Sequence, residues 1–182
     1  MPYKRSLLLA IVFSMLVACA GEFPYRDARN DQFIATNYQA ADALMASAKS
    51  LPKMLTNVPN DAPILVAALV NIDTLNQSTS LGRIVSEQLQ ARLSQLQYTV
   101  VELKLRGEVF TKKPQGELML SREISEITAA HHAQAVVVGT YALASRFIYV
   151  NLKVVDKDNL ILGAYDYTLP RTANINALIA SQ

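Results

Sequence analysis

Residues 146–169, RFIYVNLKVVDKDNLILGAYDYTL, decide the fold class because they predict an antiparallel hairpin. Along residues 147–154, apolar side chains alternate with aromatic or polar ones. Such alternation is typical of a half-buried strand, whose side chains point in turn to the core and to solvent. The core-facing set would be Ile148, Val150, Leu152 and Val154, and the solvent-facing set Phe147, Tyr149, Asn151 and Lys153.

Turn residues separate the two strands of this hairpin. Asp156-Lys157-Asp158-Asn159 has the composition of a turn, and residues 160–169 would form the returning strand. If Val154 lies opposite Ile161, the core-facing set continues through Gly163, Tyr165 and Tyr167, and Asp166 joins the solvent-facing set.

Further strands are predicted before the hairpin. Residues 64–70, ILVAALV, and 135–138, AVVV, are unbroken apolar runs, as expected for strands covered on both faces. Residues 98–103 are rich in β-forming residues, and Leu118-Met119-Leu120 predicts a short additional strand.

Helices are predicted between these strands from apolar residues at three- and four-residue steps. The first spans residues 37–50, with Asn37 as its cap; the second spans 81–96, the third 121–132, and a short one follows the hairpin at 174–180. The inward-facing residues would be Ala41, Leu44, Met45, Ala48 and Leu51 in the first, Leu81, Ile84, Val85, Leu89, Leu93 and Leu96 in the second, and Ile124, Ile127 and His131 in the third.

The order of these elements predicts an α/β fold. We expect a mixed β-sheet with helices mainly on one face, ending in an antiparallel hairpin. The chain has 182 residues, of which 51% are hydrophobic and 18% charged, and this composition suits one globular domain. We assign residues 37–182 to that domain.

The first residues are typical of a secretory signal. Lys4 and Arg5 precede an apolar run over residues 7–17, which is too short to span a bilayer because a span takes roughly 20 residues. Removal of residues 1–18 would take both cations away, so the formal net charge of +2 would fall to zero. A neutral domain without a clustered basic face argues against a nucleic-acid partner.

The signal ends in Leu16-Val17-Ala18-Cys19, which resembles the lipobox of bacterial lipoproteins. This resemblance implies cleavage before Cys19 and a lipid on its thiol; several acyl chains hold firmly because each buried methylene contributes about 0.8 kcal/mol. Cys19 is the only cysteine, so no disulfide forms within the chain. Residues 19–36 would be a tether. Ala20, in place of an aspartate, favours the outer membrane, facing the periplasm, with surface exposure as the alternative.

The chain from about Asn37 to Pro170 resembles the FlgO family of flagellum-associated outer-membrane lipoproteins. An ordered series of segments carries the likeness: residues 64–73, Ser80-Leu81-Gly82-Arg83, Ser121-Arg122-Glu123, residues 133–141 with their Val-Val-Val-Gly-Thr-Tyr, and residues 150–155. The likeness includes the lipobox and contains no catalytic motif.

This resemblance implies a structural or interaction protein, linked to flagellar basal-body assembly or stability and to motility, and not an enzyme. Its partners would be the membrane, through Cys19, and flagellar or other envelope proteins; a homo-oligomer is compatible with this role. The element order also resembles the amino-terminal domain of TolB and lipoproteins of curli secretion or peptidoglycan-synthase activation. The alternative is therefore an envelope lipoprotein that binds a small ligand or assists such a machine.

No set of residues predicts catalysis, a cofactor or a metal. The only two histidines, His131 and His132, would point about 100° apart on a helix and cannot converge on one metal. Glu123 and Glu126 resemble a carboxylate pair, but the helix dipole explains acidic residues early in a helix. No Gly-x-Ser-x-Gly elbow occurs.

Three regions are candidates for binding. Asp73 and residues 80–83 lie between a strand and a helix, where open α/β folds place ligands. Gly82 is better explained by close packing, and Arg83 by a solvated surface position or by partner binding. The basic segment 104–116 is a candidate for acidic partners, or else a solvated loop. Phe147 and Tyr149 are the stronger candidates for partner binding, because aromatics on an uncovered sheet face often mark interfaces. The alternative is that a helix covers them.

Overall fold

The computed structural model describes residues 28–49, 62–74, 79–103 and 117–180. The chain divides into two compact units, Met1–Asp31 and Gln32–Gln182. The described strands all belong to the second unit, together with the first helix from Gln32 onward. In chain order the elements are α2 (Ala28–Lys49), β1 (Ile64–Ala67), β2 (Val70–Asn71), α3 (Ser80–Gln95), β3 (Val100–Leu103), α4 (Glu117–Ala130), β4 (Ala135–Leu143), β5 (Phe147–Val155), β6 (Ile161–Pro170) and α5 (Ala173–Ala180).

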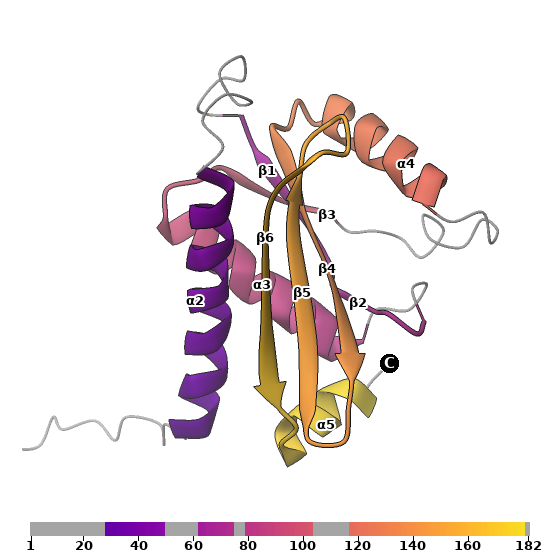
Figure 1. The fold of residues 1–182 in the computed structure, drawn as a ribbon. Helices are drawn as coiled ribbons and strands as arrows, with labels where there is room; N and C mark the ends of the chain where they lie inside the picture. The colour runs from indigo at the N-terminus through magenta and orange to yellow at the C-terminus, as the bar shows by residue number, and fades with distance from the viewer. Residues whose placement is uncertain (1–27, 50–61, 75–78, 104–116, 181–182) are drawn as a thin grey trace, which may run out of the picture. The chain divides into compact units, whose positions relative to one another are not determined.

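The strands form one mixed sheet, which confirms the predicted fold class (Figure 1). The strand order is β3-β1-β4-β5-β6, in which β1 pairs in parallel with β3 and β4, whereas β4, β5 and β6 pair antiparallel. β4 extends to Leu143, beyond the predicted strand 135–138, because its second half pairs with β5 on one side and with β2 on the other.

The apolar run 64–70, predicted as one strand, is interrupted after Ala67. Val66 pairs with Val137 but Val70 with Thr140, so this side of the ladder holds one residue more than β4 does. At the break, the Ser86 hydroxyl of α3 accepts a hydrogen bond from the Leu69 N–H at 3.0 Å and lies 3.1 Å from the Ala67 carbonyl oxygen. The buried Ser86 hydroxyl thus supplies a hydrogen-bond partner for backbone groups at the point where the strand is interrupted.

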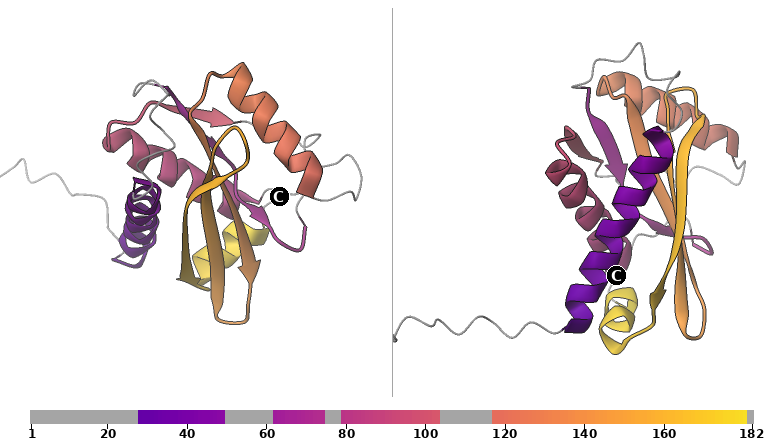
Figure 2. Two further views of the ribbon diagram at one scale, coloured as in Figure 1. Left: turned by 45° about the horizontal axis from the view of Figure 1, so that its top comes forward. Right: turned by 60° about the vertical axis from the view of Figure 1, so that its left-hand side comes forward.

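α2, α3 and α5 pack on one face of the sheet, which we call the inner face (Figures 1 and 2). The inward-facing set of β5 is confirmed, since Ile148, Val150, Leu152 and Val154 are at most 2% exposed. The buried stripe of α3 is narrower than predicted, because Ile84 is half-buried and Leu96 is exposed. The helices contribute Ala40, Ala41, Leu44, Met45, Ala48, Leu81, Val85, Leu89, Leu93 and Ile175 to this core.

α4 covers part of the opposite face, which we call the outer face. Its Ile124 packs with Leu65, Val136 and Val155 in a second, smaller cluster. α4 begins at Glu117, so residues 118–120, predicted as a short strand, are helical. Leucine and methionine are strong helix formers, and three residues are too few for periodicity to separate strand from helix.

α2 begins at Ala28, well before the predicted start at Asn37. Asn37 lies inside the helix with 0% of its surface exposed, so its prediction as a cap is wrong. Its side-chain amide donates to Gln88 Oε1 at 2.6 Å, and its Oδ1 accepts from the Tyr167 hydroxyl at 2.6 Å. Asparagine favours caps because its side chain bonds to nearby backbone, but here α3 and β6 supply the partners.

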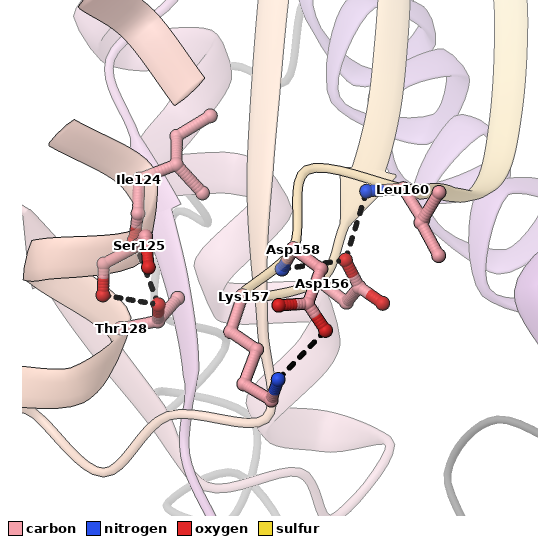
Figure 3. A network of polar contacts seen from close by, with 7 residues as sticks. All are labelled: Ile124, Ser125, Thr128, Asp156, Lys157, Asp158 and Leu160. Carbon is pink, nitrogen blue, oxygen red and sulfur yellow. Dashed lines mark hydrogen bonds and ion pairs between the residues drawn. The ribbon is translucent and has the colours of Figure 1, made fainter. Parts of the chain in front are cut away.

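The hairpin forms as predicted but in a different register. Val154 pairs with Gly163, and Val155 pairs with Ile161 across a bulge. Ile161 is therefore 53% exposed instead of core-facing, whereas Gly163, Tyr165 and Tyr167 still lie opposite inward-facing residues of β5. In the turn, Asp156 Oδ1 accepts from the N–H groups of Asp158 and Leu160 at 2.9 and 2.8 Å (Figure 3).

Candidate interaction surface

The aromatic pair of β5 lies on a part of the outer face that α4 leaves open. Phe147 is 43% exposed and Tyr149 is 51% exposed, while the cluster under α4 lies around Val136 and Val155, at the other end of the β4–β5 pair. We call this region the exposed sheet surface, formed by Phe147, Tyr149, Asn151 and Lys153 of β5 with Ala164, Asp166 and Thr168 of β6. The role of Phe147 and Tyr149 in partner binding stays a prediction.

The neighbours of Tyr149 are small. Across the strands it lies between Ala142 of β4 and Thr168 of β6, so no large side chain flanks its ring on either strand. Asp166 and Lys153 add one charge of each sign to the same surface. Exposed aromatic rings are enriched in protein interfaces, because they combine a large contact area with few rotatable bonds.

Arg83, the third candidate for partner binding, does not join this surface. It lies in the first turn of α3, a helix that packs on the inner face through Leu81 and Val85. Its guanidinium is exposed and donates to Ser80 Oγ at 3.2 Å. The structure therefore places Arg83 and the aromatic pair on opposite sides of the sheet.

The candidate ligand region from Asp73 to Arg83 is held together by its own hydrogen bonds. The Asp73 N–H donates to Asn71 Oδ1 at 3.0 Å. Thr79 caps α3, since its Oγ1 accepts from the Gly82 N–H at 3.3 Å and also bonds to the Tyr141 hydroxyl at 2.7 Å. These bonds fix the two ends of the region, and residues 75–78 between them lie outside the described residues.

Gly82 has the packing role that the sequence indicated. A Cβ atom at this position would lie 2.1 Å from the Leu69 carbonyl oxygen, far inside van der Waals contact. The backbone of α3 therefore approaches the chain between β1 and β2 as closely as only glycine allows.

Sequence reasoning missed a polar network between α2, α3 and β6. It joins Asn37, Gln88 and Tyr167, and burial raises the pKa of the Tyr167 hydroxyl above its ordinary value. Burial also raises the pKa of Tyr141, although its hydrogen bond with Thr79 works in the opposite direction. The spacing along the helix could have indicated it, because Asn37 lies four residues before Ala41 and therefore on the same buried helix face as Leu44 and Ala48.

The histidines do not form a site. Both follow the last residue of α4 and are exposed, so the prediction that His131 packs against the core is wrong. α4 ends at Ala130, and His132 takes a φ of 50°, which turns the chain away from the helix. Among the described residues, no group of three or more His, Cys, Asp or Glu side chains could hold a metal ion.

Other predicted features fall on parts of the chain that the structure does not describe. These are Cys19, the signal, residues 19–27 of the tether, the basic segment 104–116, and the side chain of Glu123; Glu126 is described and is exposed. Within the described ranges, none of the helices has both the length and the apolar character needed to cross a bilayer.

Solved structures show distant likenesses to this chain. The LpoB C-terminal domain from Salmonella enterica is 15% identical over 74% of this chain and 100% of that one, with a TM-score of 0.47. Lipoprotein GNA1162 from Neisseria meningitidis is 16% identical over 62% of this chain and 83% of that one, with a TM-score of 0.42. TM-scores this low carry no conclusion about function. Comparison with curated protein sequences gives no match.

Comparison with models of protein families gives a match over residues 38–174. The matched region begins within α2 and ends within α5, so it contains every described strand, including both exposed aromatics of β5. The matching model is that of the FlgO protein, the family that the order of sequence segments had indicated. Because this match covers most of the chain, the protein belongs to the FlgO family.

Proposed function

We propose that this protein is a non-catalytic outer-membrane lipoprotein whose domain, facing the periplasm, docks to other envelope proteins around the flagellar basal body. The match to the FlgO family over residues 38–174 is the observation that carries this proposal. The residues of the chain supply separate support for the anchor and for the docking surface.

The anchor is supported by sequence. Leu16-Val17-Ala18-Cys19 follows directly after the apolar run, and a cysteine thiol is the one side chain there that can take a thioether-linked lipid. Several acyl chains on Cys19 would bind the membrane firmly, since the free energy of transfer grows with each buried methylene. The anchor would hold the domain at the membrane while leaving its faces available to partners.

The docking surface is supported by exposure. Tyr149 presents about half of its surface to solvent on a regular antiparallel sheet, whose backbone is fixed by pairing with β4 and β6. A rigid sheet that displays an aromatic ring loses little entropy when a partner covers it. The exposed sheet surface is therefore the face that we assign to protein partners.

Co-purification with flagellar basal bodies tests the function. Basal bodies would be isolated from cells that make the native chain, Cys19→Ser, Tyr149→Ser or Ile161→Ser, and the protein would be detected by immunoblot. Ile161 is a matched control, because it is 53% exposed on the same hairpin but lies at the far end from Tyr149.

We expect the native chain and Ile161→Ser to co-purify with basal bodies, and Cys19→Ser and Tyr149→Ser to be lost from them. Swimming in soft agar should fall in the same two variants. Normal motility of a deletion strain, together with no native protein in the basal-body fraction, would refute the flagellar role.

A further inference from the structure

One end of the second unit is tied together by Arg171. Its N–H donates to the Arg146 carbonyl oxygen, its Nη1 to the Ala144 carbonyl oxygen and its Nε to Asn176 Oδ1, each at 2.9 Å. These bonds join the β4–β5 turn, the end of β6 and α5, which lie together at the lower end of Figure 1. We call this region the arginine end, formed by residues 144–147 and 170–180.

The arginine end is cationic. Residues 142–149 and 167–180 contain Arg146 and Arg171 but no aspartate or glutamate. The side-chain acceptors of Arg171 are a carbonyl and an amide oxygen, which are neutral, so they leave its positive charge uncompensated. Arg146 is exposed, and next to it Phe147 is 43% exposed.

This combination fits the head-group layer of a lipid bilayer. A guanidinium donates paired N–H groups to a phosphate and stays charged at any physiological pH. An apolar ring such as that of phenylalanine gains free energy by leaving water at the boundary between head groups and acyl chains. Phe147 and the two arginines therefore offer the apolar and the cationic contacts that such a surface binds.

α2 leads toward the same end. Ala48 lies against Gly163, and Asn37 bonds to Tyr167, so α2 runs antiparallel to β6 and Gln32 lies toward Pro170 (Figures 1 and 2). The chain thus enters the second unit at its arginine end. Along the chain, this end is the nearer one to a lipid on Cys19.

We propose that the arginine end contacts the lipid head groups of the membrane that holds Cys19. Arg146 and Arg171 bind phosphates, and Phe147 lies among the head groups. This inference rests on the proposed anchoring through Cys19. It also separates the two aromatics of β5, because Phe147 then faces lipid while Tyr149, one pleat farther along, remains available to a protein partner.

A single tryptophan tests this orientation, because the native chain contains none. The full chain, purified from membranes of the producing cells, would be reconstituted into phosphatidylcholine vesicles with and without phosphatidylglycerol. Two variants are compared: Phe147→Trp at the arginine end, and Ile161→Trp at the opposite end of the hairpin, where Ile161 is 53% exposed against 43% for Phe147.

We expect the emission of Phe147→Trp to shift to the blue and to be quenched by brominated lipids, and that of Ile161→Trp to do neither. A flotation assay on the same samples reports the anchor separately. If the protein floats with the vesicles but Phe147→Trp is not quenched, or both variants are quenched equally, the inference is overturned while the anchor stands. If the protein does not float, the anchor fails and this inference falls with it.

A matched pair of variants tests the contact between the arginines and anionic lipid. In the Phe147→Trp background, Arg146→Gln should reduce the phosphatidylglycerol-dependent part of the quenching by about 5-fold, the effect of one basic residue at an anionic surface. Lys153→Gln removes an exposed cation from the exposed sheet surface and should leave the quenching unchanged. Equal effects of the two variants would show that net charge, and not the arginine end, attracts the lipid.

Discussion

Replacing Tyr167 with phenylalanine would remove one hydroxyl from the network between α2, α3 and β6. This hydroxyl donates to Asn37 Oδ1 at 2.6 Å, and Asn37 is 0% exposed, so its oxygen would lose a partner where water cannot replace it. The ring itself would be retained, and with it the packing. Since a buried polar atom left unpaired costs about 1–3 kcal/mol, we expect Tyr167→Phe to lower the free energy of unfolding by about 2 kcal/mol.

A double-mutant cycle separates the lost hydrogen bond from other effects. Asn37→Leu keeps a similar side-chain volume and removes the acceptor of the Tyr167 hydroxyl. It also removes the donor to Gln88 Oε1, so it should cost more than Tyr167→Phe, but this second loss is common to the single and the double variant and cancels in the cycle. The double variant removes both partners of the bond. Its destabilisation should therefore be smaller than the sum of the two single effects by about 1–2 kcal/mol.

Urea unfolding of the full chain measures these differences as shifts of the midpoint at constant m-value. Tyr165→Phe is the control, because Tyr165 stacks on Tyr167 with 6.3 Å between ring centroids but is 37% exposed, and we expect it to change stability by less than about 0.5 kcal/mol. The reasoning would be refuted if the destabilisation of the double variant equalled the sum of the two single ones to within about 0.5 kcal/mol. It would also be refuted if Tyr167→Phe destabilised the protein no more than the control does.

Three further predictions concern other contacts. Gly82→Ala places a Cβ 2.1 Å from the Leu69 carbonyl oxygen, and we expect a loss of about 3 kcal/mol in urea unfolding; a loss no larger than that of Ser94→Ala, an exposed position on the same helix, would contradict this. Asp42→Asn breaks the ion pair with Arg92, whose atoms lie 2.8 Å apart, but the two side chains are 41% and 30% exposed, so the loss should be only about 0.5 kcal/mol and should shrink in high salt. A larger, salt-independent loss would show that this pair is not screened. Burial raises the pKa of Tyr167, so the folded state keeps its proton to higher pH than the unfolded state does. This pKa difference contributes to the free energy of unfolding. The contribution is complete below the unfolded pKa of about 10 and falls as the pH rises above it, by at most about 1.4 kcal/mol per pH unit. Tyr167→Phe should flatten this decline, and equal slopes in both proteins would exclude Tyr167 as its cause.

The candidate interaction surface was accessible to sequence reasoning in part. Alternation along β5 placed Phe147 and Tyr149 away from the core, and both are exposed. Arg83 came from a different segment, and no local pattern says on which side of a sheet a helix will pack. Its separation from the aromatic pair became visible only once α3 was seen to cover the inner face through Leu81 and Val85.

The sequence by itself determined the order of the elements and the buried face of each central strand. The periods of about 2 residues in a strand and about 3.6 in a helix are local properties of the chain, so they show which face of an element is apolar before its partners are known. The sequence also names Cys19 as the candidate anchor, because the lipobox is a contiguous run of four residues.

Only the tertiary structure decided the break after Ala67, the hairpin register and the place of Asn37 inside α2. Each depends on groups that are distant along the chain. Ser86 serves the backbone at the break, and the partners of Asn37 lie 51 and 130 residues away. The free energy of such contacts depends on where three elements meet, and no window of neighbouring residues contains that information.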